Sequence, residues 1–395
     1  MDEIIKRAQF ETRAIHLGRV PEDGTGAVTT AIYPSSTYRV KAPGDESGYV
    51  YSRWANPTRS ALEEALASLE NGTHAYAFSS GLAALNAVMN LLKSGDHVVA
   101  VSDLYGGTRR QFENLLRPQF NIDFAYVDGR DPADFEKAIK GNTRLFWIET
   151  PTNPLLHLVD IERVSAIARK HDILTAVDNT FATPFIQQPL DLGADIVHHS
   201  ASKYLGGHCD VIAGALVVRD DKLAERLRFS QYAVGGQLGP FESWLVLRGL
   251  KTLALRMERH SVNLMKIVEY LESVDLVETI YYPGQDGTPV PNKMKLPGGM
   301  VSFTIKADFE AVKQFVQATR VFVLAESLGG VESLVNHPAS MTHASIPQEV
   351  REKNGITDSL VRLSVGIEHI DDLLIDLRQA FAVLRKAVKQ TSSGV

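Results

Sequence analysis

The sequence predicts an α/β protein with a large domain, built on a mostly parallel sheet covered by helices on both faces, and a smaller α+β domain. Between about residues 58 and 220, short apolar runs alternate with amphipathic segments, and strands that are apolar on both sides are typical of a sheet between two helical layers. From about residue 250, a long helical pattern precedes further strands and a closing helix. We therefore expect an N-terminal arm over 1–55, the large domain over 56–250 and the smaller domain over 251–395.

The elements follow from the apolar periodicity. Residues 1–55 have no clear period and contain clusters of Pro, Gly and Ser, so an arm is predicted there. A helix is expected over 81–93 of the large domain. Its predicted strands are 75–78, 97–101, 124–127, 145–148, 173–177, 196–199 and 213–218.

The smaller domain begins with a predicted helix over 251–273, in which Leu264, Ile267, Val268 and Leu271 recur at helical spacing. Strands are predicted at 299–305 and 360–365. An amphipathic helix over 371–384 closes the chain and has two aspartates in its first turn, where the helix dipole favours them.

Composition excludes several classes of protein. The chain has 395 residues, 44% hydrophobic and 22% charged, and a net charge of −6 without long runs, which argues against nucleic-acid or membrane-surface partners. Cys209 is the only cysteine, so an intrachain disulfide is excluded. The N-terminus lacks the apolar core of a signal peptide, and the longest uncharged apolar stretch is about half of the ~20 residues of a membrane helix. We expect a cytoplasmic protein.

Polar clusters follow five of the predicted strands, and the carboxyl ends of parallel strands share one edge of a sheet, where ligands bind. The clusters are Ser79–Leu82, 103–108, 150–154, Asp178 and Lys203 with its neighbouring hydroxyls. An acid and a lysine at this edge are what an enzyme needs to hold pyridoxal phosphate: the lysine forms a Schiff base, and the acid keeps the ring nitrogen protonated. A buried lysine has a lowered pKa and therefore a neutral, nucleophilic amine. On local evidence, Asp178 could equally cap a helix and Lys203 could be a solvated surface side chain.

The other clusters have similar alternatives. Ser80, Gly81 and Leu82 begin a helix, whose free amides suit a phosphate, although a serine there is also a common helix cap. Tyr105 could stack on an aromatic cofactor or simply pack at the rim. Asn153 could bind a ring oxygen or belong to an ordinary Pro-Thr-Asn-Pro turn.

Arg362 lies on a strand whose alternation sends its apolar neighbours to the opposite face. Its guanidinium could bind a substrate carboxylate in bidentate fashion or form an interdomain salt bridge. Nucleotide-binding and α/β-hydrolase fingerprints are absent from the sequence. We expect no metal, because the clustered His198, His199, His208 and Cys209 lack an established ligand spacing.

Taken together, the motifs resemble the Cys/Met-metabolism family of pyridoxal-phosphate enzymes, over nearly the whole chain. The matching segments are 49–59 (YVYSRWANPTR), 80–84 (SGLAA), 105–108 (YGGT), 149–154 (ETPTNP), 178–181 (DNTF), 200–204 (SASKY), 326–330 (ESLGG) and 362–366 (RLSVG). The resemblance implies a PLP-dependent transferase fold of type I, which is the aspartate-aminotransferase-like fold.

The resemblance also implies residue roles. Lys203 is the Schiff-base lysine and the proton shuttle, Asp178 pairs with the ring nitrogen, and Tyr105 stacks on the ring. The phosphate is held by Ser80, Gly81, Leu82, Ser200 and Ser202 and, from a neighbouring subunit, by Tyr51 and Arg53. A homo-oligomer with shared sites, usually a tetramer, follows. Asn153 and Arg362 receive the substrate carboxylate, and Ser327 helps to place Lys203.

Subfamily features narrow the expected reaction. Methionine γ-lyases usually carry Cys where this chain has Gly107, which argues against that activity. Enteric-type cystathionine β-lyases tend to carry Trp where this chain has Leu328. Glu326 with Arg110 is similar to the γ-lyase and γ-synthase pattern, where they address the distal end of the substrate. The segment 283–297 is shorter than in the family and lacks its usual His-Pro run. The expected reaction is γ-elimination of L-cystathionine to cysteine, 2-oxobutanoate and ammonia, with β-elimination as a side activity; γ-synthesis, β-lysis or a catalytically silent scaffold are the alternatives.

Overall fold

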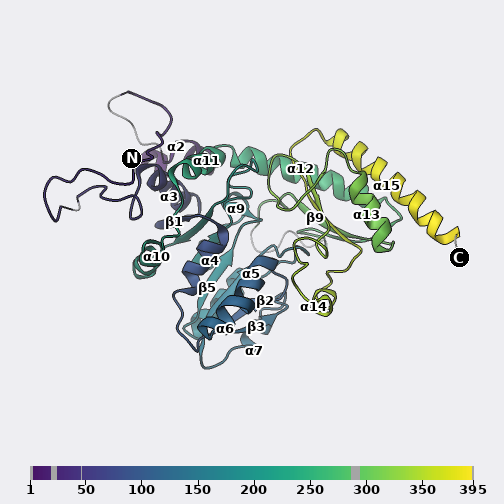
Figure 1. Cartoon of the computed structure of the whole chain (residues 1–395), viewed down its shortest axis with the longest axis horizontal. Helices are drawn as coiled ribbons and strands as arrows, with labels where there is room; N and C mark the ends of the chain where they lie inside the picture. Colours follow the sequence, from purple (N-terminus) through teal and green to yellow (C-terminus); the bar gives the residue numbers. More distant parts are fainter. Residues whose placement is uncertain (1–2, 19–24, 46, 286–293, 394–395) are drawn as a thin grey trace.

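The computed structural model describes residues 3–18, 25–45, 47–285 and 294–393. Figure 1 shows two parts: a larger one around the central sheet, and a smaller one that carries β9, α13 and α15. Most of the segment 283–297, which the sequence predicts to be a shortened loop, lies outside the described residues.

The large part contains a seven-stranded sheet in the order β1-β7-β6-β5-β4-β2-β3. β7 runs antiparallel to both of its neighbours, so the other strands all run in one direction. The sheet is therefore mostly parallel, as predicted, and each predicted strand is present within two residues of its expected ends. The strands are β1 (His74–Phe78), β2 (His97–Val101), β3 (Asp123–Val127), β4 (Thr143–Glu149), β5 (Leu174–Asp178), β6 (Ile196–His199) and β7 (Gly214–Val218).

Helices cover both faces of this sheet because its strands are apolar on both sides. Ile196 packs into the core on one face, and the next residue, Val197, packs into the core on the other. The helix expected over 81–93 ends earlier, at Met89, because Asn90 forms its C-cap. The covering helices are α3 (Pro57–Leu69), α4 (Gly81–Met89), α5 (Gly106–Gln111), the π-helical turn Phe112–Leu116, α6 (Arg117–Phe120), α7 (Ala133–Lys137), α8 (Ile161–Lys170), α9 (Thr183–Ile186), the 3-10 turn Pro189–Leu192, α10 (Asp221–Val234) and α11 (Pro240–Leu250).

The N-terminal segment, for which an arm is predicted, contains two short helices that the sequence analysis does not predict. It begins with α1 (Glu3–Lys6) and α2 (Phe10–His16), and Phe10, Ala14 and Leu17 are buried in the same core as α3. These three apolar residues recur at helical spacing, but the run is too short to stand out in the sequence. The described residues from 25 to about 50 are irregular and extend away from the body, at the left of Figure 1.

The smaller part is a five-stranded sheet in the order β10-β11-β12-β9-β8, of which the sequence predicts β9 and β12. The closing helix runs to residue 393 rather than ending at 384. Phe303, Phe315 and Phe381 meet in the core between the sheet and its helices. The elements are β8 (Val277–Tyr281), β9 (Met300–Ile305), α13 (Phe309–Ala318), β10 (Val323–Leu324), β11 (Leu334–Asn336), α14 (Gln348–Lys353), β12 (Leu360–Ser364) and α15 (Ile370–Ser393).

One helix, α12 (Leu253–Glu272), belongs to both parts and crosses between them in Figure 1. Leu253 and Met257 pack in the core of the large part, whereas Leu264 and Leu271 pack in that of the smaller part. The boundaries at residues 55 and 250 stay predictions.

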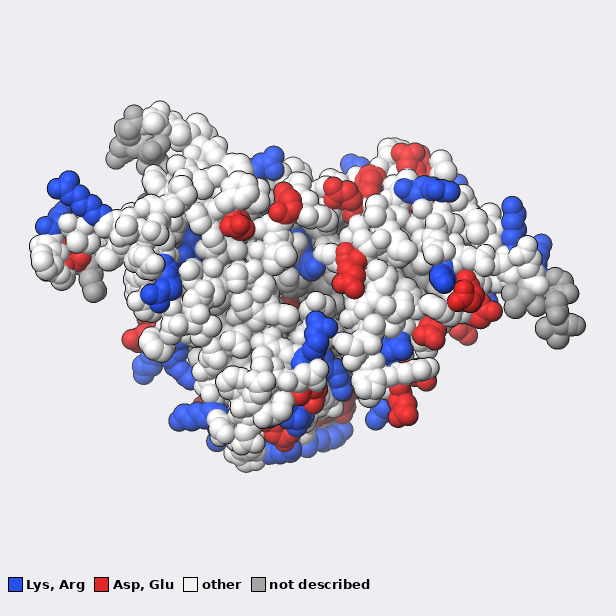
Figure 2. Space-filling view, in the orientation of Figure 1, with Lys and Arg blue, Asp and Glu red and all other residues white. Residues whose placement is uncertain are grey.

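Acidic and basic side chains are interspersed over the face shown in Figure 2. Within the described ranges, no helix is both long and apolar enough to cross a membrane.

Candidate active site

The predicted polar clusters lie at one edge of the sheet. β1, β2, β4, β5 and β6 run in the same direction, so the residues that follow them gather at their common carboxyl edge. Asp178 is the last residue of β5, and Lys203 follows β6. Gly81, the first residue of α4, is so close to the Lys203 loop that a Cβ atom there would lie 3.1 Å from Cβ of Ser200.

Lys203 is partly buried, and its Nζ donates a hydrogen bond of 2.6 Å to Oγ of Ser327. Burial, together with the nearby charge of Arg362, lowers the pKa of Lys203 to about 8. Ser327 has a φ of 86°, a left-handed conformation that costs a non-glycine residue about 1–3 kcal/mol. The surrounding loop maintains it, since a Cβ atom at Gly329 would lie 2.7 Å from the backbone nitrogen of Tyr204.

Asp178 is buried and has a cationic partner that the sequence analysis missed. Oδ2 of Asp178 lies 3.1 Å from Nδ1 of His198, and its Oδ1 accepts a 3.0 Å bond from the amide of Thr180. Burial by itself would raise the pKa of Asp178, but the charge of His198 and the Thr180 donors outweigh it and lower that pKa. In turn Asp178 raises the pKa of His198, although burial opposes this. The site therefore contains a carboxylate held as an anion.

His198 also contacts the start of α4, because its Nε2 lies 2.8 Å from the carbonyl oxygen of Gly81. The next residue, His199, is fully buried against Glu70, and Asn179 donates to the same carboxylate. Both histidines thus have protein partners. His198 pairs in register with Asp178 across β5 and β6, and this register brings the two side chains together.

Several groups at the start of α4 could hold an anion. The hydroxyl of Ser80 accepts a 3.1 Å bond from the amide of Ala83, so Ser80 is the helix cap. The first-turn amides of Gly81 and Leu82 have no intrahelical acceptor, as at any helix start. The hydroxyl of Ser202 is bonded to both the amide and the carbonyl of Ala213, at 2.9 and 3.1 Å.

Arg362 is 1% exposed and connects the two parts of the protein. Its Nη1 donates to Oδ1 of Asn153 at 2.7 Å, and its Nη2 donates to the carbonyl oxygen of Ser327 at 3.0 Å. Nε of Arg362 is buried and has no hydrogen-bond partner in the described part of the chain. Among the described residues, the guanidinium thus connects the two parts through neutral acceptors and not through a carboxylate. A buried donor without a partner suits an incoming carboxylate.

Tyr105 directly precedes α5, and its side chain is 39% exposed. Its backbone amide donates a 3.0 Å bond to Oε2 of Glu149, the last residue of β4. The ring lies over Gly107, where a Cβ atom would come within 2.3 Å of Cε1 of Tyr105. Arg110 and Glu326 are exposed, and Nη1 of Arg110 lies 3.5 Å from Oγ of Ser345.

Tyr51 and Arg53 lie in the N-terminal segment, and Arg53 packs against α10. Arg53 donates to the carbonyl oxygen of Tyr232 at 3.2 Å, and its guanidinium lies 4.5 Å from the centre of the Tyr232 ring. That Tyr51 and Arg53 help to hold the phosphate in the site of a neighbouring subunit stays a prediction.

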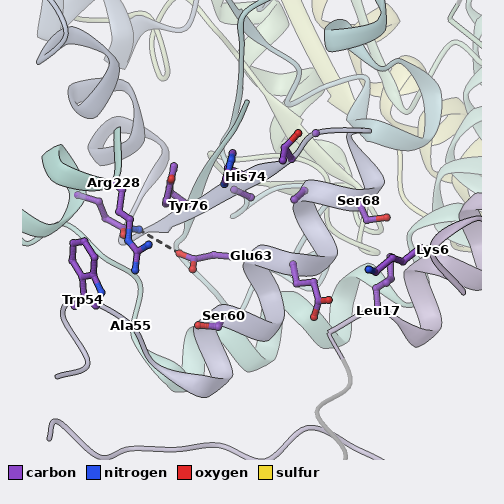
Figure 3. A pocket seen from close by; sticks show the side chains of 16 residues that line it. Lys6, Leu17, Trp54, Ala55, Ser60, Glu63, Ser68, His74, Tyr76 and Arg228 are labelled. Carbon is purple, nitrogen blue, oxygen red and sulfur yellow. Dashed lines mark hydrogen bonds between the residues drawn. The ribbon is translucent and has the colours of Figure 1, made fainter. Parts of the chain in front are cut away.

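A separate groove of about 510 Å³ lies over α3 and the open edge of β1 (Figure 3). Glu63 points into it and accepts a 2.9 Å bond from the amide of Ala77, while Arg228 stacks on Trp54 with 3.8 Å between guanidinium and ring centre. Lys203, Asp178 and Arg362 are not among the described residues that line this groove. Its polar groups form contacts with the edge strand β1 and with the helices beside it.

Comparisons with known proteins agree with this arrangement. Residues 11–382 match the model of the family described as Cys/Met metabolism PLP-dependent enzyme. A cystathionine beta-lyase of Coxiella burnetii is 50% identical over 95% of this chain and 98% of its own length. A cystathionine gamma-lyase of Bacillus subtilis is 51% identical over 94% of this chain and 98% of its own length. The crystal structure of a cystathionine gamma-lyase from Lactobacillus plantarum complexed with L-serine superposes with a TM-score of 0.92, at 47% identity, and covers 96% of this chain and 100% of its own.

Because the family model spans nearly the whole chain and the fold agrees, the chain belongs to the Cys/Met metabolism family of PLP-dependent enzymes, and its cofactor is pyridoxal phosphate.

Proposed function

We propose that this protein cleaves the C–S bond of L-cystathionine, with γ-elimination to L-cysteine, 2-oxobutanoate and ammonia as its main reaction. The observation that carries the proposal is the amine of Lys203, with its lowered pKa, held at Ser327 next to the buried guanidinium of Arg362. If the guanidinium of Arg362 binds the carboxylate of an amino-acid substrate, the amine of Lys203 can act on that substrate. Similar proteins named cystathionine lyases supply the substrate class.

The residues at the carboxyl edge fit pyridoxal phosphate. Lys203 would bond to its aldehyde, and Asp178, an anion beside His198, would hold the proton of the ring nitrogen. The amides of Gly81 and Leu82, with the hydroxyls of Ser80, Ser200 and Ser202, would hold the phosphate, and Tyr105 would cover the ring. When bound, the cofactor supplies an electron sink for the charge left at Cα of the substrate.

The remaining groups act on the substrate. Arg362, through its unpaired Nε, and Asn153 bind the α-carboxylate and thereby orient the Cα–H bond. Nζ of Lys203 removes the Cα proton and carries it onward, and Ser327 keeps that amine in place. The hydroxyl of Tyr105 protonates the departing sulfur. Glu326 and Arg110 would face the distal amino-acid end of cystathionine.

β-Elimination to homocysteine and pyruvate is the second candidate, because relatives of equal similarity are named cystathionine beta-lyase. It requires fewer proton transfers than γ-elimination. γ-Synthesis from an O-acylhomoserine and cysteine is the third, since a Bacillus subtilis relative with that name is 45% identical. We further propose a cytoplasmic homo-oligomer, dimer or tetramer, whose sites Tyr51 and Arg53 complete across subunits.

Product identification tests the reaction. Purified, cofactor-loaded protein is incubated with L-cystathionine: cysteine with 2-oxobutanoate supports γ-elimination, and homocysteine with pyruvate makes the protein a β-lyase. The absence of cleavage moves the assignment to γ-synthesis, which O-acylhomoserine plus cysteine then tests. Lys203→Ala must abolish both turnover and the covalent attachment of the cofactor by borohydride reduction. A protein that stays colourless with added cofactor would be a silent scaffold.

A further inference from the structure

Three buried carboxyl groups lie at or just after the ends of neighbouring strands at the site, although the proposed reaction uses only one of them. Asp103 follows β2, Glu149 ends β4 and Asp178 ends β5, and β4 lies between the other two strands. Glu149 is 5% exposed and pairs in register with Asp178. It therefore needs a partner that explains its burial.

That partner is the backbone of Tyr105. Oε2 of Glu149 accepts the amide of Tyr105 at 3.0 Å, at the residue where the chain turns into α5. The Tyr105 side chain is 39% exposed, so side-chain packing alone restrains it weakly. Its ring rests on the backbone of Gly107, and Gly106 is so close to Thr342 that a Cβ atom would lie 2.5 Å from its carbonyl oxygen. The start of α5 is thus fixed between Glu149 and the smaller part of the protein.

The charges around Glu149 favour a protonated carboxyl group. Asp178 has Nδ1 of His198 at 3.1 Å, whereas Glu149 accepts a hydrogen bond from the neutral backbone amide of Tyr105. Burial, and then the negative charge of Asp178, raise the pKa of Glu149 well above its ordinary value. Burial also raises the pKa of Asp103 to about 7. Arg362 also lies close enough to interact with the charge of Glu149, and the backbone amide of Asn153 donates to the same carboxyl group.

We propose that Glu149 is a positioning residue: Oε2 of its buried carboxyl group holds the amide of Tyr105 and so places the Tyr105 ring for catalysis. The raised pKa of Glu149 favours its neutral form, beside which Asp178 stays the anion of this edge. The proposal rests on the proposed function only in that Tyr105 acts in it.

The test compares Glu149→Gln, which keeps the acceptor without a charge, with Glu149→Leu, which removes the acceptor. We expect Glu149→Gln to retain kcat within about two-fold and to leave the pH profile unchanged. Glu149→Leu should lose about 10- to 100-fold in kcat, because an unsatisfied buried amide costs about 1–3 kcal/mol, and KM should change less. In a Tyr105→Ala background, Glu149→Leu should have little further effect. If the Leu variant does not fold, Glu149→Asp, which is one methylene shorter, replaces it.

The visible circular dichroism of the bound cofactor provides a readout that needs no substrate. It should be altered in Glu149→Leu and preserved in Glu149→Gln. A Gln variant as impaired as the Leu variant would show that the charge is required, and an undiminished effect in the Tyr105→Ala background would show that Glu149 acts elsewhere. Either result overturns the proposal. If the wild-type protein does not cleave cystathionine, only the proposed function is wrong. The circular dichroism of the bound cofactor still tests the role of Glu149.

Discussion

Replacing His198 by Asn should destabilise the apoprotein in a strongly pH-dependent way. His198 and Asp178 are 4% and 8% exposed and lie 3.1 Å apart. Removing one partner of a buried ion pair costs about 3–5 kcal/mol. Thr180 continues to donate to Asp178, so we expect the lower end, about 3 kcal/mol in the free energy of unfolding at pH 6.

The sign of the pH effect follows from the two pKa shifts. The raised pKa of His198 contributes stability below its ordinary value near 6.5, and this is lost as pH rises through the folded value. The lowered pKa of Asp178 contributes above its ordinary value near 3.9 and is lost as pH falls through the folded value. The pair therefore stabilises the fold most between these limits, and the cost of His198→Asn should be larger at pH 6 than at pH 10.

Urea unfolding of the apoprotein at the two pH values measures this difference. His97→Asn is the matched control: His97 is fully buried on β2 and bonded to Thr143, and burial lowers its pKa. A lowered histidine pKa disfavours the fold at low pH, so this control should cost less at pH 6 than at pH 10. Equal costs of His198→Asn at both pH values, or the same trend in both variants, would refute the reasoning.

Three further outcomes are expected. Arg362→Lys should reduce kcat/KM for cystathionine by about 30-fold, since a lysine loses the bidentate grip worth about 2 kcal/mol, and a value within two-fold of wild type would contradict carboxylate binding. Ser327→Ala and Ser327→Gly should both lower kcat about five-fold by removing the 2.6 Å bond to Lys203, while the glycine variant, at a φ of 86°, should melt at the higher temperature. Equal melting temperatures would contradict the strain. Because the pKa of Lys203 is lowered to about 8, the rate of covalent cofactor attachment to the apoprotein should rise through that pH, and a midpoint near 10.4, as for free lysine, would contradict the burial of the amine.

The sequence could predict the central sheet because its strands are short and apolar on both faces, with polar residues directly after them. Those polar residues needed no long-range information: the direction of parallel strands brings Asp178 and Lys203 to one edge. Ser327 follows none of these strands, and the motif resemblance alone implied its contact with Lys203, which the structure contains.

The partners of these residues were harder to predict. His198 lies inside an apolar strand and Glu149 is the last residue of another, so neither side chain gives a periodic signal, and the roles of both depend on the register between neighbouring strands. α1 and α2 were missed because their apolar stripe is short. Strands β10 and β11 contain only 2 and 3 residues, which is below the length at which alternation can be recognised.

The helix α12 holds both ends of the site. Arg256 donates a 2.6 Å bond to the carbonyl oxygen of Tyr204, next to Lys203, and one turn later His260 lies 2.6 Å from the carbonyl oxygen of Val365, at the end of the strand that carries Arg362. A single inserted residue between them would rotate one contact by about 100° and move it by about 1.5 Å relative to the other. One turn of α12 therefore sets the spacing between the segment that carries Lys203 and the strand that carries Arg362. Insertions and deletions should therefore be tolerated in surface loops but not between residues 256 and 260.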